Sequence, residues 1–96
     1  MTMHERDLYI KALEKWGFAS QKQMAIEELA ELIVALSKFG RKINRSTVKD
    51  IASELTDAKI MIEQLQIIFK IDNTEIYELK QKKLKRLEEL LSIEEE

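Results

Sequence analysis

An unbroken run of three- and four-residue steps between apolar side chains is the feature that most limits the folds open to this chain. The run consists of Val48, Ile51, Leu55, Ala58, Ile62, Leu65 and Phe69. Such steps line up apolar side chains on one face of an α-helix, which turns once in about 3.6 residues. The 96 residues include no proline and only two glycines, Gly17 and Gly40. Because sandwiches and barrels need many turn residues, the sequence predicts an all-α fold.

The two glycines and two polar clusters divide the chain into four predicted helices. These span about Thr2 to Trp16, Ser20 to Phe39, Ser46 or Thr47 to Phe69, and Thr74 to Ser92. Thr2 with Glu5, and Ser20 with Gln23, match the capping-box pattern at a helix start. We expect the second and third helices to form an antiparallel hairpin, with the other two packed around it in a four-helix bundle. A length of 96 residues predicts a single domain over residues 1–96.

The two central helices are apolar beyond one stripe, which favours an oligomer. The additional apolar residues are Ile26, Ala30, Ile33 and Val34 on one helix, and Ile60, Met61, Ile67 and Ile68 on the other. A four-helix chain of this size cannot cover all of them. We therefore expect a homodimer or homotetramer that completes the bundle.

Composition removes several classes of function. The chain has no cysteine, which excludes disulfides, thiolate zinc sites and cysteine nucleophiles. It has 16 basic and 18 acidic residues, and this balance argues against a nucleic-acid partner. The sequence has no run of about 18 apolar residues, so it predicts no membrane span. Its first residues contain no apolar signal core. We expect a cytoplasmic protein without a membrane partner.

Two acidic stretches carry the candidate chemistry. The second predicted helix contains Glu27, Glu28 and Glu31, and the third contains Glu54 and Asp57. A spacing of three residues places Glu28 with Glu31, and Glu54 with Asp57, on one helical face. Each of these four carboxylates is next to a residue of the core stripe, so the two pairs can face each other across the hairpin. Crowded carboxylates repel one another, and a bound divalent cation would remove that penalty.

An all-oxygen ligand set favours Mg²⁺, with Mn²⁺ as a substitute. A di-iron site of the ferritin type requires Glu-x-x-His motifs, and the only histidine is His4 near the N-terminus. Ordinary surface glutamates on a solvated helix give the same spacing. The residues alone leave both interpretations open.

The acidic pattern resembles the signature of MazG-like nucleoside triphosphate pyrophosphohydrolases. Glu27-Glu28-x-x-Glu31 is followed, after 22 intervening residues, by Glu54-x-x-Asp57. The flanking sequence from about Trp16 to Leu91 is also similar to that of small single-domain members. Thr56 departs from the small residue common at its position.

This resemblance implies an all-α enzyme that hydrolyses a nucleoside triphosphate to the monophosphate and diphosphate, as a dimer or tetramer. It implies that Glu28, Glu31, Glu54 and Asp57 are Mg²⁺ ligands. Glu27 would join a second ion or orient a water. The competing hypothesis is a non-catalytic helical interaction module, which explains the long amphipathic helices and leaves the paired carboxylates unexplained.

Four further residues are candidates for substrate binding. Lys83 and Arg86 interrupt the apolar stripe of the fourth predicted helix, where they contact phosphate or extend their charges into water. Lys38, with Arg41, Lys42 and Arg45, forms a basic patch that either binds the triphosphate or simply ends a helix. Gln21 either hydrogen-bonds a base edge or belongs to the first turn of its helix.

Overall fold

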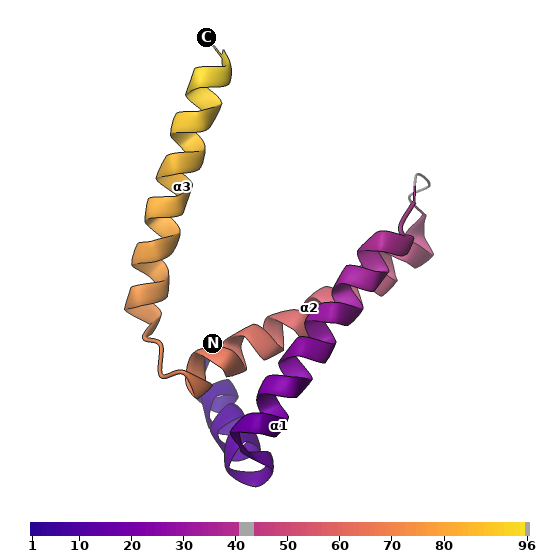
Figure 1. The fold of residues 1–96 in the computed structure, drawn as a ribbon, viewed down its shortest axis with the longest axis vertical. Helices are drawn as coiled ribbons and strands as arrows, with labels where there is room; N and C mark the ends of the chain where they lie inside the picture. The colour runs from indigo at the N-terminus through magenta and orange to yellow at the C-terminus, as the bar shows by residue number, and fades with distance from the viewer. Residues whose placement is uncertain (41–43, 96) are drawn as a thin grey trace.

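The computed structural model describes residues 1–40 and 44–95, and this part of the chain contains helices and no strands. The helices are α1 (Met3–Lys38), α2 (Arg45–Ile68) and α3 (Asn73–Glu95) (Figure 1). The prediction of an all-α class is confirmed. None of these helices combines the length and hydrophobicity that a membrane crossing requires. Arg41 and Lys42 of the predicted basic patch lie outside the described residues.

Helix α1 is broken at Gly17, as the sequence predicts. Gly17 has φ 85° and ψ 166°, a non-helical conformation, and the segments before and after it run in different directions (Figure 1). Glycine tolerates this conformation because it has no Cβ. The predicted new start at Ser20 is wrong, since helical structure resumes directly after Gly17.

The helix starts depend on side-chain caps. The predicted capping box at Thr2 is confirmed: the Glu5 backbone N–H donates to Thr2 Oγ1 at 3.1 Å, and the Thr2 N–H donates to Glu5 Oε1 at 2.7 Å. The prediction that Ser46 or Thr47 caps α2 is wrong. Asn44 is the cap, and its Oδ1 accepts from the Thr47 N–H at 2.9 Å. Asn44 has the extended backbone that an N-cap adopts.

The second segment of α1 and helix α2 lie side by side and form the hairpin (Figure 1). We use "the hairpin" below for residues 18–40 together with 44–69. Its core is small: Ala25, Ala58 and Met61 are the buried apolar residues in the seam between the helices. Alanines at the seam let the two backbones approach closely. Tyr9 from the first segment of α1 is also buried, and its hydroxyl donates to Glu63 Oε2 at 3.3 Å.

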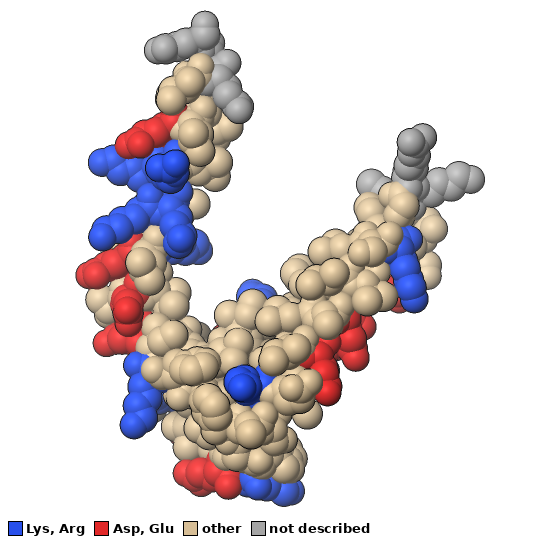
Figure 2. All heavy atoms as spheres, viewed as in Figure 1, with Lys and Arg blue, Asp and Glu red and all other residues tan. Residues whose placement is uncertain are grey.

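Helix α3 stands apart from the hairpin. Within the described residues, no Cα atom of α3 lies within 8 Å of a Cα atom of α1 or α2. The space-filling view shows open space between α3 and the hairpin (Figure 2). The chain therefore does not form the predicted four-helix bundle by itself. The predicted apolar positions of α3 remain exposed at 41–51%; they are Ile76, Leu79, Leu84, Leu87, Leu90 and Leu91.

Candidate metal centre

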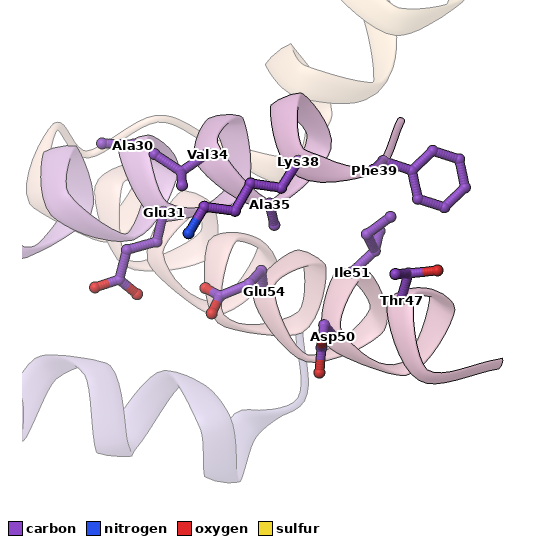
Figure 3. Close-up of a pocket in the computed structure, with 10 residues that line it drawn as sticks. All are labelled: Ala30, Glu31, Val34, Ala35, Lys38, Phe39, Thr47, Asp50, Ile51 and Glu54. Carbon is purple, nitrogen blue, oxygen red and sulfur yellow. The ribbon is translucent and has the colours of Figure 1, made fainter. Parts of the chain in front are cut away.

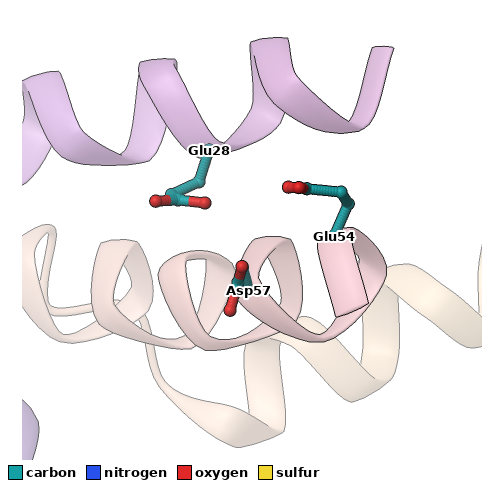
Figure 4. Close-up of side chains that lie close together, drawn as sticks. All are labelled: Glu28, Glu54 and Asp57. Atoms are coloured by element: carbon teal, nitrogen blue, oxygen red, sulfur yellow. The ribbon is translucent and has the colours of Figure 1, made fainter. Parts of the chain in front are cut away.

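The hairpin brings the two acidic stretches together across its seam. Glu28 projects from α1 toward α2, which supplies Glu54 and Asp57 (Figure 4). One carboxylate oxygen from each of these three residues lies within 4.8 Å of the other two. Glu54 and Asp57 share a face because they are three positions apart in a helix. The predicted convergence of Glu28, Glu54 and Asp57 is therefore present. We call these three residues the acidic group.

Glu31 lies beside this group without being part of it. Its negative charge acts on both Glu28 and Glu54, and it lines the same cavity as Glu54 (Figure 3). Glu31 itself is exposed. Glu27 is also exposed and is outside the group of three. One position along an α-helix corresponds to a rotation of about 100°, so Glu27 emerges to one side of Glu28.

Glu28 and Glu54 are the two carboxylates of the site whose pKa values are raised. Partial burial raises the pKa of Glu28, and the charges of Glu31, Asp57 and Glu54 raise it further. Partial burial is also the largest cause of the raised pKa of Glu54, and the charges of Glu31 and Asp57 raise this pKa further. Burial removes water from the charged form of a carboxyl group, and neighbouring negative charges repel it. Both effects disfavour the ionised state that a metal ligand requires, until a cation is bound.

Each of these two glutamates also has a carboxylate oxygen without a partner. Oε2 of Glu28 and Oε2 of Glu54 are both buried and accept no hydrogen bond. Buried polar atoms are normally paired, and an unpaired one costs about 1–3 kcal/mol. Oxygens of this kind fit a hard cation, because Mg²⁺ binds carboxylate oxygen and keeps waters in its remaining positions.

A cavity of 430 Å³ adjoins the acidic group between α1 and α2 (Figure 3). Its lining residues are Ala30, Glu31, Val34, Ala35, Lys38, Phe39, Thr47, Asp50, Ile51 and Glu54. Lys38 extends along the cavity toward Glu31 and Glu54, so this candidate binding residue does lie next to the acidic group (Figure 3). The cavity therefore has an apolar wall, one lysine side chain and several carboxylates.

The other three candidate binding residues lie elsewhere. Gln21 is 1% exposed, its Nε2 has no hydrogen-bond partner, and it does not line the cavity. Lys83 and Arg86 are exposed on α3, which does not approach the acidic group within the chain. A contact between these two cations and a ligand at the acidic group requires α3 of another molecule or a movement of α3.

Asp50 and Thr47 also line the cavity, and neither is among the predicted site residues. Asp50 also adds to the negative charge that raises the pKa of Glu54. A spacing of four residues from Asp50 to Glu54 places both on one helical face, so the signal was present in the sequence. Thr47 was assigned to a cap, and it does contribute to the Asn44 cap as well as to the cavity.

Comparison of the chain with protein-family models, with curated proteins and with solved structures gave no match.

Proposed function

We propose that this protein is a Mg²⁺-dependent hydrolase that converts a nucleoside triphosphate to the nucleoside monophosphate and diphosphate. The observation that carries the proposal is the convergence of Glu28, Glu54 and Asp57 within 4.8 Å, two of them with unpartnered buried oxygens. Glu31 lies close enough to add a fourth carboxylate when a cation is present. Mn²⁺ has similar ligand preferences and should substitute for Mg²⁺.

The charges of the site fit such a substrate. A triphosphate is strongly anionic and would be repelled by bare carboxylates, so a divalent cation is needed between the two. A cation bound here supplies Lewis-acid chemistry and lowers the pKa of a water that it holds. Glu28, Glu54 and Asp57 would hold the ion, and Lys38 at the adjoining cavity offers a positive charge to a phosphate. The apolar wall of that cavity offers room for a less polar part of the substrate.

We propose further that the protein works as a homodimer or homotetramer in the cytoplasm. The exposed apolar side chains of α3 and the small buried core support an assembly, because a chain with so few buried residues has little packing to hold it folded. In that assembly Lys83 and Arg86 can contact phosphate at the site of a neighbouring molecule, and Gln21 keeps its assignment as a substrate-binding candidate.

A second candidate function is a non-catalytic helical interaction module. The unpartnered apolar side chains of α3 favour it, because an exposed apolar helix face is a usual binding surface for another protein. This candidate gives no reason for crowded carboxylates with unpaired oxygens in the hairpin seam.

The products of nucleotide incubation separate these proposals. The protein is incubated with a panel of ribo- and deoxynucleoside triphosphates, including base-modified ones, in Mg²⁺ or Mn²⁺. We expect monophosphate and diphosphate in equal amounts, because cleavage falls between the α and β phosphates. Release of orthophosphate and nucleoside diphosphate would exclude the proposed reaction. No turnover of any nucleotide would favour the interaction module.

A further inference from the structure

A second cavity lies where the beginning of the chain meets the connection between α2 and α3. Its lining comes from the first segment of α1, the end of α2, the connection and the start of α3. These segments meet near the end of the chain marked N in Figure 1. The volume is 670 Å³, within the range of small-molecule sites in proteins. We call it the junction cavity, and it shares no lining residue with the cavity beside the acidic group.

The walls of the junction cavity are mainly aliphatic. The aliphatic side chains come from α1, α2 and the connection, and they are Ile10, Leu13, Ile67 and Ile71. All four are half-buried, so they are packed within the chain and still have surface open to the cavity. Burying hydrocarbon against such walls is favourable because it removes apolar surface from water. The junction cavity therefore suits a ligand with an apolar part.

Two cations also line the junction cavity. Arg6 comes from α1 and Lys70 from the connection, and Asp72 is the one acidic residue among the described lining residues. Asp72 Oδ1 accepts from the Thr74 N–H at 2.8 Å, so this carboxylate caps the start of α3. The lining has a surplus of one positive charge, which matches a ligand with one negative charge.

Lys70 occupies a backbone position that favours glycine. Its φ is 55°, its N–H donates to the Ile67 carbonyl at 3.1 Å, and the Ile71 N–H donates to the Gln66 carbonyl at 2.9 Å. This is the Schellman pattern that ends a helix, and its left-handed residue is usually glycine because a Cβ is strained there. A lysine at this position lowers stability relative to glycine and adds a cationic side chain to the cavity. Local strain of this kind is typical of functional positions.

A side chain holds the wall that the connection forms. Gln66 Nε2 donates to the Ile71 carbonyl at 3.3 Å and to Asn73 Oδ1. Since Gln66 belongs to α2 and Asn73 begins α3, these bonds fix the connection between the two helices. A wall that is already fixed loses less conformational freedom when a ligand binds.

We propose that the junction cavity binds a small apolar carboxylic acid as its anion. Arg6 and Lys70 pair with the carboxylate, and the aliphatic walls contact the hydrocarbon part. A guanidinium group presents two parallel N–H donors that match the two oxygens of a carboxylate, and the lysine ammonium adds a second positive charge. A carboxylate balances the surplus charge of the lining, whereas an amine of the same length adds to it and is repelled.

Octanoate titrated into the full-length, ¹⁵N-labelled protein tests the proposal, and octylammonium is the matched probe with the same chain length and the opposite charge. We expect saturable changes in the amide signals of Ile10, Ile67 and Lys70 with octanoate. The Kd should be about 1 mM or lower for a ligand of this size. Octylammonium should bind at least about tenfold more weakly, because it meets two cations at the cavity.

Lys70→Gly separates the loss of a charge from damage to the fold, because glycine is favoured at φ 55°. We expect its Tm without octanoate to rise while its Kd for octanoate increases about tenfold. Arg6→Gln should increase the Kd by about the same factor, since each variant loses one charge-assisted contact. Lys49→Gln removes a positive charge from an exposed position outside the junction cavity and should leave the Kd unchanged.

Four results would overturn the proposal. The first is the absence of saturable changes up to about 10 mM octanoate. The second is equal binding of octylammonium, and the third is an unchanged Kd in either Lys70→Gly or Arg6→Gln. The fourth is a set of signal changes confined to the exposed apolar residues of α3, which would place octanoate on that helix. None of these readouts involves nucleotide hydrolysis, so the result is independent of the proposed function.

Discussion

The residues that most clearly set this chain apart from a simple helical bundle are Glu28 and Glu54. Each is half-buried at the seam between α1 and α2, has a raised pKa, and has one buried oxygen without a hydrogen-bond partner. A helical hairpin selected only for stability would have polar groups here that are paired or fully solvated. Destabilising groups retained in one place are typical of functional sites.

The raised pKa values of Glu28 and Glu54 predict that stability falls as pH rises. Between the ordinary pKa of a glutamate and the raised value, the folded protein binds more protons than the unfolded chain. The contribution is therefore complete below the unfolded pKa and is lost as pH rises through the folded pKa. In a chelator, thermal unfolding should show a steeper decrease of Tm with pH in this window for the natural protein than for Glu28→Gln/Glu54→Gln. Equal slopes for the two proteins would contradict this prediction.

Glu28→Gln should separate metal binding from fold. Removing this charge relieves repulsion at the acidic group, so the Tm without metal should rise while the increase of Tm on adding Mg²⁺ becomes smaller. Glu14→Gln is the control, because Glu14 is exposed in the first segment of α1, outside the candidate site. Differential scanning fluorimetry across a Mg²⁺ titration measures both quantities. The same Mg²⁺ response in Glu28→Gln and the natural protein would argue against Glu28 as a ligand.

Glu54→Ala should lower the rate of nucleotide hydrolysis by more than about a hundredfold. Changes in the outer groups around a metal already reduce affinity or activity by about 10–100-fold, and loss of a ligand itself should exceed that. Glu14→Ala removes the same charge from an exposed position in the first segment of α1 and should leave the rate nearly unchanged. Initial rates of diphosphate release at saturating Mg²⁺ measure the difference. Equal losses in both variants would point to a general charge effect.

At the scale of the elements, α1 depends on one glycine for its shape. The break at Gly17 redirects the chain, so that Tyr9 from the first segment can reach Glu63 on α2. Apart from its chain neighbours and the backbone of its own helix, nothing lies within 4 Å of the position that a Cβ would take at Gly17, so only the backbone conformation restricts this position. The positions of the helices therefore depend on local backbone chemistry as well as on the apolar stripes.

Gly17→Ala should destabilise the protein by about 1–3 kcal/mol, because a non-glycine residue is strained at φ 85° and ψ 166°. Gly40→Asn provides the comparison. Gly40 has φ 58°, in the left-handed region that asparagine tolerates, so its cost should be well below that of Gly17→Ala. Urea unfolding followed by circular dichroism gives both free energies. Equal destabilisation by the two changes would contradict the assignment of strain to Gly17.

At the scale of the whole molecule, the described chain has very little interior. Its buried residues are Tyr9, Ala25, Ala58, Met61 and Gln21, and α3 adds none. Helical stability in proteins comes mainly from packing an apolar face against another element, so a 23-residue helix without such packing needs a partner. The proposed assembly of two or more chains would supply that packing for α3.

Stability should therefore depend on protein concentration. Only folded chains can assemble, so association stabilises the folded state. The Tm of the natural protein should therefore rise as its concentration increases. Leu87→Glu, which places a charge among the exposed apolar side chains of α3, should have a lower Tm that does not change with concentration. Scanning calorimetry over a hundredfold range of concentration measures this. A concentration-independent Tm for the natural protein would contradict assembly.

The sequence by itself determined the local features of this protein. The three- and four-residue apolar steps predict the helices, Gly17 predicts the break in α1, and Thr2 with Glu5 predicts the first cap. The pairing of Glu28 with Glu54 and Asp57 was also predictable, because spacing within each helix and a short connection between α1 and α2 fix which faces meet. The cap at Asn44 was missed because Asn44, Ser46 and Thr47 are all good cap residues, and only the backbone selects among them.

Only the tertiary structure decided where α3 lies. Its apolar stripe predicts that the helix packs against something, but a stripe does not specify whether the partner is the same chain or another. That choice depends on the connection at residues 69–72, where the hydrogen bonds of Gln66, Lys70, Ile71 and Asp72 direct α3 away from the hairpin. The burial of Gln21 and the separation of Lys83 from the acidic group follow from the same packing. Helical periodicity acts over a few turns of one helix, whereas these distances depend on how whole helices are oriented.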